Sequence, residues 1–345
     1  MTRQTWTAFV AAVAFVLIAV GMVVLPVPYV SWTPGSTTNT LGSVDNRPVI
    51  NISGITTYPT KGQLDLTTVS ETRADSRLSL PEALLSYWLP YRDTLPRELI
   101  FPPGKTAEQV NSESRVMMET SQSNSVVAAL RAAGEPVTQR PAVASVVVGS
   151  AAYNYLQPGD LIVSINGKQV TSNRQAADLI RSQPAGSTLI FHVIRDRTER
   201  VVRFSSSATN GGDSSLSGIT IGDGFQYDPE ISFDLGEQIG GPSAGLIFSL
   251  AIYDKITPGA LIGNRRIAGT GTIDASGNVG VIGGLQQKLA GAADAGATVF
   301  LVPAGNCRDL AGISTQLTVI RVDTLHDAID AIESLDHGSK ALPHC

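Results

Sequence analysis

The sequence predicts an α+β fold divided among several domains, and three observations support this prediction. An uninterrupted apolar run occupies residues 7–25, residues 142–205 alternate between short strands and turns around one helix, and residues 216–336 alternate between helices and strands. Strand segments place apolar residues at every second position, whereas helical segments place them three and four apart. Both patterns in separate stretches are typical of a multidomain α+β chain.

The chain is long and apolar enough for this organisation. Its 345 residues are 43% hydrophobic, which suffices for two or three buried cores. A net charge of −5 without a basic cluster excludes nucleic acid as a partner, because phosphate binding requires grouped Lys and Arg. We expect five parts: residues 1–30 as a cytoplasmic tip and transmembrane anchor, 31–134 as a linker and small β/α region, 135–208 as the β-rich domain, 216–336 as the C-terminal domain, and 337–345 as a polar tail.

The N-terminal segment predicts a transmembrane helix. Residues 7–25 read TAFVAAVAFVLIAVGMVVL without a charge, so one helix can cross the hydrocarbon core of a bilayer. Trp6, Tyr29 and Trp32 flank the run, as interfacial aromatic residues do. A cleaved signal peptide is the alternative, but the run is longer than a signal core and no A-x-A site follows it. We expect a single-pass anchor with the remaining domains outside the cytoplasm.

The two cysteines are too few for a disulfide framework. Cys345 belongs to the polar tail SKALPHC and is expected to be free, and no role follows for Cys307. The sequence predicts no cofactor and no metal site.

The stretch before the β-rich domain is expected to be structurally mixed. Residues 48–52 and 63–69 alternate well enough for two strands. Five prolines interrupt LPEALLSYWLPYRDTLPRELIFPPGKT, which therefore predicts only short helices and turns. A longer helix begins at Thr106, since Thr106 and Gln109 fit a capping box, and Gly134 ends it. The polar SQSNS in its centre favours a bend or two helices.

Residues 142–205 read as a β-rich module with one helix. The order is a strand AVASVVVG, a turn, LQPGDLIVSINGKQV with the hairpin signal Asn166-Gly167, a helix QAADLIRSQ, and the strands STLIFHVIR and ERVVRFS. This order resembles a PDZ domain of the bacterial type. The resemblance implies that an extended peptide adds to a sheet edge, with a simple spacer as the alternative. No glycine-rich carboxylate loop precedes Val143, so we assign no peptide-binding residues.

Ser243 lies in a local sequence suited to a nucleophile. In IGGPSAGLIFSLAIY the glycines permit a tight turn, and the apolar run after the serine predicts a buried helix that starts at Ser243. Unpaired amides and the positive dipole end at a helix start can stabilise the oxyanion that forms when a hydroxyl attacks an amide.

A Ser-His-Asp triad is the rival interpretation of GPSAG, because it fits G-x-S-x-G. That motif follows a buried strand, and FDLGEQIGG supplies none. Downstream, His326 lies near the start of an amphipathic helix capped by Thr324 with Asp327, and the other two histidines belong to the tail. These histidines favour solvated positions over a catalytic one.

A serine without a histidine requires another base, and Lys288 is the candidate. A lysine whose pKa is lowered by burial can accept the hydroxyl proton as a neutral amine. Lys288 lies on a helix that begins near Gly284, at the margin of its apolar stripe. By this spacing alone, Lys288 would be an ordinary surface lysine.

The order of motifs resembles the proteolytic domain of the Lon family. GGPSAG is followed by NRRIAGTGTIDASGNVGVIGG, by the lysine helix ending in AGA, and by the strand TVFLVP. The resemblance implies that Ser243 is the nucleophile, that Lys288 is its general base, and that Thr270 in AGTGTI lies beside the lysine amine. It also implies a homo-oligomer, because Lon relatives form rings.

Two departures from the Lon pattern limit what the resemblance implies. Lon proteins carry an acidic residue three positions before the serine, where this chain has Gly240, so no accessory acid is expected there. The chain also lacks G-x-x-x-x-G-K-[ST], the phosphate-binding motif of an ATP-driven motor. The order of anchor, PDZ-like domain and Lon-type domain is similar to the membrane-bound PDZ–Lon proteases of the YlbL type.

These observations predict an ATP-independent serine endopeptidase that is anchored in the lipid bilayer through residues 7–25. Its expected substrates are unfolded or extended polypeptides outside the cytoplasm, cut by Ser243 and Lys288 with support from Thr270. The alternative is a membrane-tethered PDZ scaffold that binds peptides and whose proteolytic domain is silent.

Overall fold

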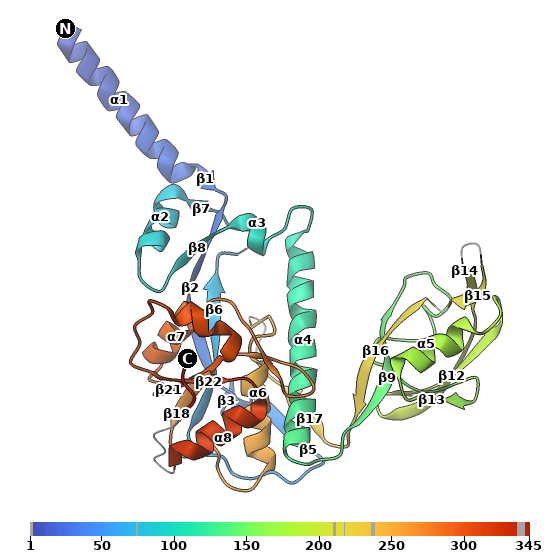
Figure 1. The fold of residues 1–345 in the computed structure, drawn as a ribbon. Coiled ribbons are helices and arrows are strands. Elements are labelled where there is room, and N and C mark those ends of the chain that lie inside the picture. The colour runs from blue at the N-terminus through green and yellow to red at the C-terminus, as the bar shows by residue number, and fades with distance from the viewer. Residues whose placement is uncertain (1–2, 74, 210–211, 217, 236–238, 337–341) are drawn as a thin grey trace. The chain divides into compact units, whose positions relative to one another are not determined.

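The computed structural model describes residues 3–73, 75–209, 212–216, 218–235, 239–336 and 342–345, and these residues form two units (Figure 1). Unit 1 contains residues 1–134 and 229–345, and unit 2 contains residues 135–228. The chain therefore leaves unit 1, folds unit 2, and returns to complete unit 1. The expected small β/α region of residues 31–134 is not a body of its own, because it shares one unit with the C-terminal domain.

A six-stranded sheet explains why these two stretches belong together (Figure 1). Its strands lie in the order β22 (Thr318–Val322), β21 (Val299–Pro303), β18 (Arg266–Gly269), β6 (Gln63–Glu71), β2 (Tyr29–Asn39) and β8 (Asp93–Pro96). The first four strands are parallel, and β2 is antiparallel to both of its neighbours. The parallel pairing of β6 with β18 thus joins the early stretch of the chain to the late one.

Helices cover both faces of this sheet. Ala268 packs into the apolar cluster of α7 (Leu285–Asp294). The next residue, Gly269, lies against Ile247 of α6 (Gly245–Ile256). Because successive strand residues point to opposite faces, α7 and α6 lie on different sides of the sheet. The interior of unit 1 is therefore a helix–sheet–helix arrangement.

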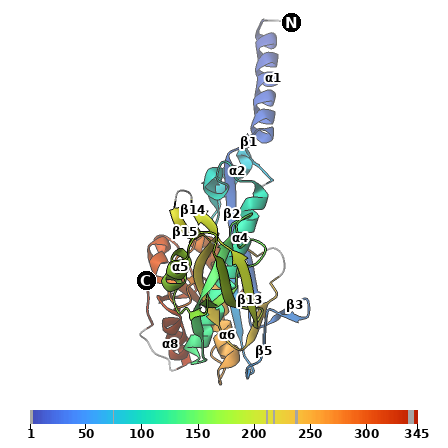
Figure 2. The same ribbon diagram turned by 90° about the vertical axis from the view of Figure 1, so that its right-hand side faces the viewer.

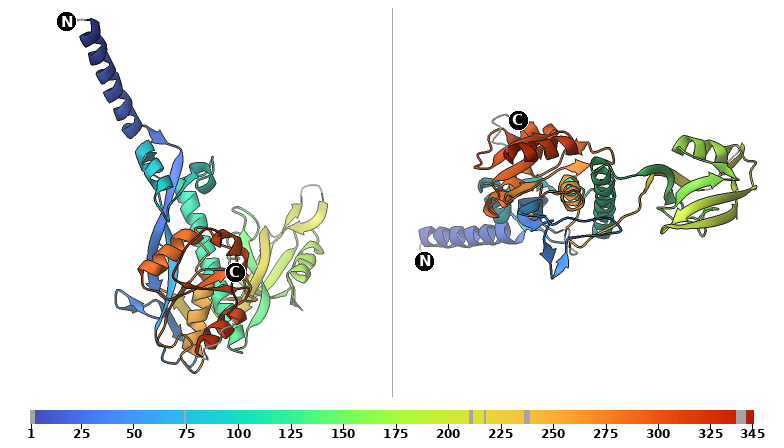
Figure 3. Two further views of the ribbon diagram at one scale, coloured as in Figure 1. Left: turned by 60° about the vertical axis from the view of Figure 1, so that its left-hand side comes forward. Right: turned by 90° about the horizontal axis from the view of Figure 1, so that it is seen from below.

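Two further helices, α4 (Ala107–Ala132) and α8 (Leu325–Asp336), pack against α6 (Figure 3). The Thr106 hydroxyl accepts a hydrogen bond from the Gln109 amide, and the Gln109 side chain accepts one from the Thr106 amide, which confirms the predicted capping box. The expected bend or division is wrong, because α4 is one continuous helix. Its central serines are tolerated because their hydroxyls bond to backbone carbonyls.

Shorter elements complete unit 1. They are four two-stranded sheets and three short helices. The sheets pair β1 (Pro26–Val27) with β7 (Leu78–Ser79), β3 (Ser43–Val44) with β4 (Arg47–Pro48), β5 (Ile50–Ser53) with β17 (Glu230–Phe233), and β19 (Thr272–Ile273) with β20 (Val279–Gly280). The helices are α2 (Leu80–Trp88), α3 (Arg97–Ile100) and η1 (Ala304–Leu310). Strands β19 and β20 form a short antiparallel hairpin within the segment NRRIAGTGTIDASGNVGVIGG.

The apolar N-terminal segment forms α1 (Arg3–Val24), and none of its described residues is buried (Figure 2). It is the one helix among the described residues that is long and apolar enough to cross a membrane. Trp32 is not one of its interfacial residues. The Trp32 indole nitrogen is buried, and the indole ring packs against Gly283, just before α7. Trp32 therefore belongs to the packing between β2 and the start of α7.

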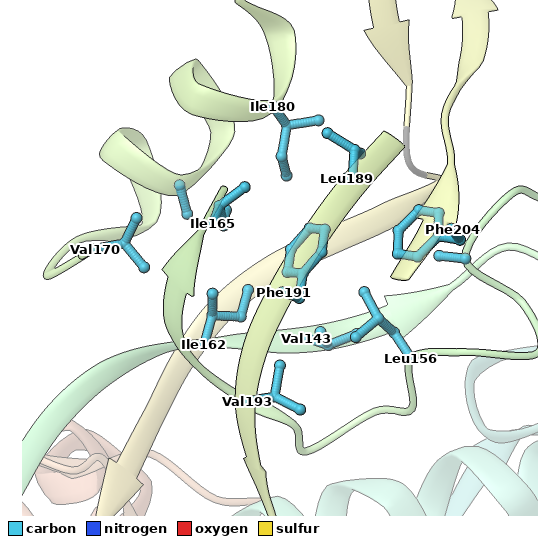
Figure 4. Packing of buried hydrophobic residues seen from close by; sticks show 12 residues of the cluster. Val143, Leu156, Ile162, Ile165, Val170, Ile180, Leu189, Phe191, Val193 and Phe204 are labelled. Carbon is cyan, nitrogen blue, oxygen red and sulfur yellow. The ribbon is translucent and has the colours of Figure 1, made fainter. Parts of the chain in front are cut away.

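Unit 2 is a sheet with one covering helix, as its sequence predicts. The main path runs in the order β13 (Thr198–Ser205), β12 (Thr188–Arg195), β10 (Leu161–Ile165), β9 (Thr138–Val146) and β16 (Ile219–Gln226), and the short strand β11 (Lys168–Gln169) pairs with β10. Helix α5 (Asn173–Arg181) is capped by Ser172. Phe191, Phe204 and Ile162 meet in the core beneath it (Figure 4).

The end of unit 2 lies later than the sequence predicts. Instead of a polar linker after residue 208, the chain forms β14 (Ser207–Thr209) and β15 (Gly212–Leu216), and β16 then pairs along β9. Residues 219–226, expected in the C-terminal domain, therefore belong to the sheet of unit 2. Their alternation fits either domain, and only the long-range pairing with β9 decides between them.

A disulfide bond joins Cys307 to Cys345, so the expectation that Cys345 is free is wrong. The tail returns to the sheet because the Arg321 amide of β22 donates to the Pro343 carbonyl at 2.9 Å. This contact brings Cys345 to η1, where the Cα atoms of the two cysteines are 5.1 Å apart. The two cysteines are 38 positions apart in the chain, which concealed the pairing from sequence reasoning.

Candidate active site

Ser243 lies in the turn that leads into α6. The turn requires Gly241, whose φ of 84° is in the left-handed region that glycine adopts without strain. Helix α6 starts at Gly245, two positions later than expected, and it has no side-chain cap. The Ser243 carbonyl accepts a hydrogen bond from the Gly271 amide at 2.8 Å. The turn is therefore fixed to the segment that connects β18 with β19.

Helix α4 holds the same turn from the other side. The Ser121 hydroxyl donates to the Pro242 carbonyl at 2.9 Å, and the Ser125 hydroxyl donates to the Gly245 carbonyl at 3.0 Å. Sequence reasoning missed both serines, because the polar SQSNS segment was interpreted as a helix break. The cluster of serines in the middle of this helix is a signal that could have identified them. Buried hydroxyls require hydrogen-bond partners, so such a cluster indicates a contact with another segment of the chain.

Lys288 is buried, with 3% of its surface exposed, in contrast to the surface position that its helical spacing predicts. It lies one turn into α7, whose first residue follows Gly284. The Lys288 amine lies 2.7 Å from the Ser243 hydroxyl and 2.8 Å from the Thr270 hydroxyl. The structure therefore brings the three predicted site residues together from three separate segments of unit 1.

Burial lowers the pKa of the Lys288 amine to about 7. The ammonium form loses its hydration inside the protein, whereas the neutral amine loses much less, so burial favours the neutral form. A substantial fraction of Lys288 is therefore neutral at neutral pH. A neutral amine 2.7 Å from a hydroxyl can accept its proton.

Thr270 is fully buried and connects the lysine to the serine backbone. Its hydroxyl accepts from the Lys288 amine and donates to the Ser243 carbonyl at 3.0 Å. One hydroxyl thus limits the orientation of the amine and of the turn at once. Rigid positioning of this kind keeps reacting groups aligned.

The backbone at the start of α6 offers amides for an oxyanion. Among the residues that the structure describes, none accepts a backbone hydrogen bond from the amide of Ser243 or from that of Ala244. Both amides adjoin a helix start whose dipole favours negative charge. A carbonyl oxygen polarised at this position would receive two donors close to the serine hydroxyl.

The rival site receives no support from the geometry. His326 is exposed on α8, and the Ser243 hydroxyl contacts the Lys288 amine instead. At the acid position of the Lon pattern, a side chain on Gly240 would lie 2.6 Å from the Ser114 hydroxyl oxygen of α4, so this hydroxyl would have to rotate away to admit it.

Comparison with known families identifies the domain that contains Ser243, Thr270 and Lys288. Residues 238–334 match the Lon protease (S16) C-terminal proteolytic domain, and this range contains all three site residues. The chain carries a Lon-type proteolytic domain. Residues 142–195 match the PDZ domain family, so unit 2 is a PDZ domain inserted between the two parts of unit 1.

Several curated relatives that match part of this chain are Lon proteases. Lon protease 2 of Herpetosiphon aurantiacus is 37% identical over 93 residues, which are 26% of this chain and 11% of the relative. The Lon protease of Clostridium beijerinckii is 39% identical over 93 residues, again 26% of this chain and 11% of the relative. Lon protease 2 of Bacillus subtilis is 31% identical over 106 residues, which are 31% of this chain and 19% of the relative. The match thus spans less than a fifth of these proteins.

Among solved structures, part of this chain is similar to the PDZ domain of the SdrC-like protein from Listeria monocytogenes. That match has 26% sequence identity and a TM-score of 0.23, and it covers 24% of this chain and 86% of the PDZ structure. A PDZ domain of the SdrC-like protein from Listeria innocua matches at 26% identity with a TM-score of 0.22, over 23% of this chain and 90% of that structure.

Proposed function

We propose that the chain is a membrane-anchored serine endopeptidase that works without ATP, with Ser243 as nucleophile and Lys288 as general base. The observation that carries the proposal is the 2.7 Å contact between the Lys288 amine and the Ser243 hydroxyl in a buried site. Burial supplies a neutral amine, and the Lon-type domain supplies the protease context.

In the first step, the neutral Lys288 amine removes the hydroxyl proton of Ser243, and the serine oxygen attacks the carbonyl carbon of a peptide bond. The carbonyl oxygen becomes an oxyanion, and the Ser243 and Ala244 amides before α6 are available to stabilise it. The ammonium of Lys288 then protonates the leaving amine, the C–N bond breaks, and an ester to Ser243 remains.

In the second step, neutral Lys288 removes a proton from a water molecule, which attacks the ester carbon. The same amides support the second oxyanion, and the proton returns to the serine oxygen as the C–O bond breaks. Thr270 keeps its contact with the lysine amine in both steps. The products are a carboxylate, an amine and the original enzyme.

The proposal that ATP is not required is supported by the lack of a G-x-x-x-x-G-K-[ST] motif in this sequence. A protease without an unfolding motor requires substrates that are already unfolded or extended. The PDZ domain fits this requirement, because PDZ domains bind extended peptides at a sheet edge. The homo-oligomer implied by the Lon resemblance stays a prediction.

We place the catalytic domain outside the cytoplasm. Helix α1 is long and apolar enough to cross the membrane once. The Cys307–Cys345 disulfide supports the orientation, because disulfides persist in oxidising compartments and are rare in the cytosol.

The test uses the full chain in detergent or bilayers and a casein-like unfolded substrate. We expect the wild type to cleave it equally with and without ATP, and we expect Ser243→Ala and Lys288→Ala to lose this activity. Equal cleavage by all three proteins would show that the pair is not catalytic. Absence of cleavage by the wild type, together with retained peptide binding by the PDZ domain, would support the silent scaffold instead.

A further inference from the structure

Helix α2 packs against unit 1 with its small residues and exposes its large ones. Its two buried residues are Ala83 and Ser86, and the Ser86 hydroxyl forms a hydrogen bond with the Ser31 hydroxyl of β2. The apolar residues Leu85 and Trp88 are 53% and 73% exposed. A helix at the surface of a soluble protein normally has the opposite arrangement, with its apolar face buried.

The exposed apolar residues form one stripe. Pro81, Leu84, Leu85 and Trp88 are separated by the three- and four-residue spacing that places them on one helix face. Tyr87, 71% exposed, lies beside this stripe. Contiguous apolar surface of this kind marks an interaction site, because water solvates it poorly.

The stripe lies beside the end of the proposed membrane span. Ala19, Met22 and Val23 of α1 form one wall of a groove of about 390 Å³, and α2 forms the other. Figures 1 and 2 both show α2 next to the C-terminal end of α1. The surface that α2 exposes therefore continues the surface that α1 offers to lipid.

Backbone pairing fixes this placement. Pro26, two residues after α1 ends, pairs with Ser79, and Ser79 is the N-cap residue of α2. The chain therefore cannot leave the membrane without bringing α2 to the same level. Aromatic residues such as Trp88 and Tyr87 are suited to this level, since their rings favour the boundary between acyl chains and headgroups.

We propose that α2 lies in the headgroup region of the membrane, with Leu84, Leu85 and Trp88 inserted among the acyl chains. An apolar helix face of this kind enters roughly 5–10 Å into the interface. Arg77 and Arg92, exposed on either side of α2, then lie at the level of the lipid phosphates. This proposal rests on the membrane span proposed above and adds a second contact with the bilayer.

The second contact orients the catalytic domain. Strand β2 pairs with β8 beside α2 and continues beneath α7. There the two backbones are in close contact, because a Cβ atom added to Gly291 of α7 would lie only 2.9 Å from the Gly35 carbonyl oxygen of β2. A strand rises about 3.3 Å per residue, so Gly35 lies roughly 20 Å along β2 from Tyr29. The lysine helix is thus held near the membrane surface by a rigid strand, where extended segments emerging from the bilayer are within reach.

The test measures quenching of tryptophan fluorescence in the full chain, reconstituted into vesicles of phosphatidylcholine and phosphatidylglycerol with brominated acyl chains. The Trp6→Phe variant retains Trp32 and Trp88, and the Trp6→Phe/Trp88→Phe variant retains Trp32 alone, so their difference is the Trp88 signal. We expect bromines near the headgroup to remove most of the Trp88 emission. The wild type reports Trp6 at the end of α1 and tests the span separately.

Three outcomes are distinguishable. Strong quenching of Trp88 by shallow bromines supports the proposal. If Trp6 is quenched but Trp88 is not, and a water-soluble quencher reaches Trp88, then the span stands and the α2 contact is wrong. If neither quencher reaches Trp88, a protein partner covers α2, and the proposal is again wrong. In the same vesicles, we expect Leu85→Glu to reduce the Trp88 quenching and the matched exposed substitution Val116→Glu on α4 to leave it unchanged.

Discussion

The Thr270 hydroxyl oxygen lies 2.8 Å from the Lys288 amine nitrogen and donates its own proton to the Ser243 carbonyl. This buried hydroxyl therefore connects the base to the backbone that carries the nucleophile. No other described hydroxyl bonds to both residues. The positions of the amine and of the turn are consequently coupled through one side chain.

Removal of this hydroxyl is the first prediction. Thr270→Val keeps the shape of the side chain but removes both hydrogen bonds, so we expect kcat to fall about ten- to a hundredfold, as the loss of one or two buried bonds implies. Thr270→Ser keeps the hydroxyl and should retain most of the activity. Steady-state kinetics on an unfolded substrate measures both. Full activity of Thr270→Val would exclude the positioning role.

The pH dependence of cleavage is the second prediction. The pKa of Lys288 is about 7, and only the neutral amine can accept the serine proton. We therefore expect kcat/KM to rise as pH increases through about 7 and to level off above it. Lys288→Arg keeps a cation that does not lose its proton and should be inactive at every pH. An activity that falls over the same interval contradicts the general-base role.

The third prediction concerns stability and uses the same pKa. The folded-state pKa of about 7 is below the ordinary lysine value of 10.5, so between these values the unfolded chain binds more protons. The free energy of unfolding should therefore rise with pH across that window, and the cost of the buried ammonium is complete below it. Lys288→Met removes the cost and should be more stable at neutral pH by on the order of 3 kcal/mol. Thermal or urea unfolding at several pH values measures this difference, which should shrink toward alkaline pH.

The fourth prediction tests how α4 supports the nucleophile turn. Ser121→Ala removes the bond to the Pro242 carbonyl, so we expect kcat to fall roughly tenfold with little change in KM. Ser249→Ala is the matched control. The Ser249 hydroxyl is also buried, and it donates to the Gly245 carbonyl. That carbonyl also accepts a hydrogen bond from Ser125, so it keeps a partner in the Ser249→Ala variant. Equal losses in the two variants would indicate a general effect on α6 rather than positioning of the turn.

The predictability of this structure differs between its parts. The hairpin of β10 and β11 at Asn166-Gly167 and the helix caps at Thr106 and Thr324 depend on residues close in the chain, and local patterns predict them. The merger of residues 31–134 with the C-terminal domain was not predictable in this way. It depends on the parallel pairing of β6 with β18, which are separated by the whole of unit 2.

The candidate site shows the same division. Ser243 has a local signature of glycines and a following apolar helix. Lys288 has no local signature, because the helix spacing does not show that β2 and β6 cover the side of α7 that carries it. Only the motif order of the Lon-type domain pointed to this residue. The serines of α4 were missed because their partners, the backbone carbonyls around Ser243, lie more than a hundred positions away.

The disulfide supplies the last prediction. Cys307 lies in η1 next to Asn306, whose side chain bonds to both the amide and the carbonyl of Ile282, two residues before Gly284 and α7. Closing a loop of this length, with cysteines 38 positions apart, stabilises the fold by about 4 kcal/mol. We therefore expect reductant to lower the melting temperature and the activity of the wild type, whereas the Cys307→Ser/Cys345→Ser variant should be less stable from the start and insensitive to reductant.

Alkylation of the cysteines in intact cells is the second measurement for the disulfide. Cysteines that react without prior reduction would contradict both the disulfide and the placement of the catalytic domain in an oxidising compartment.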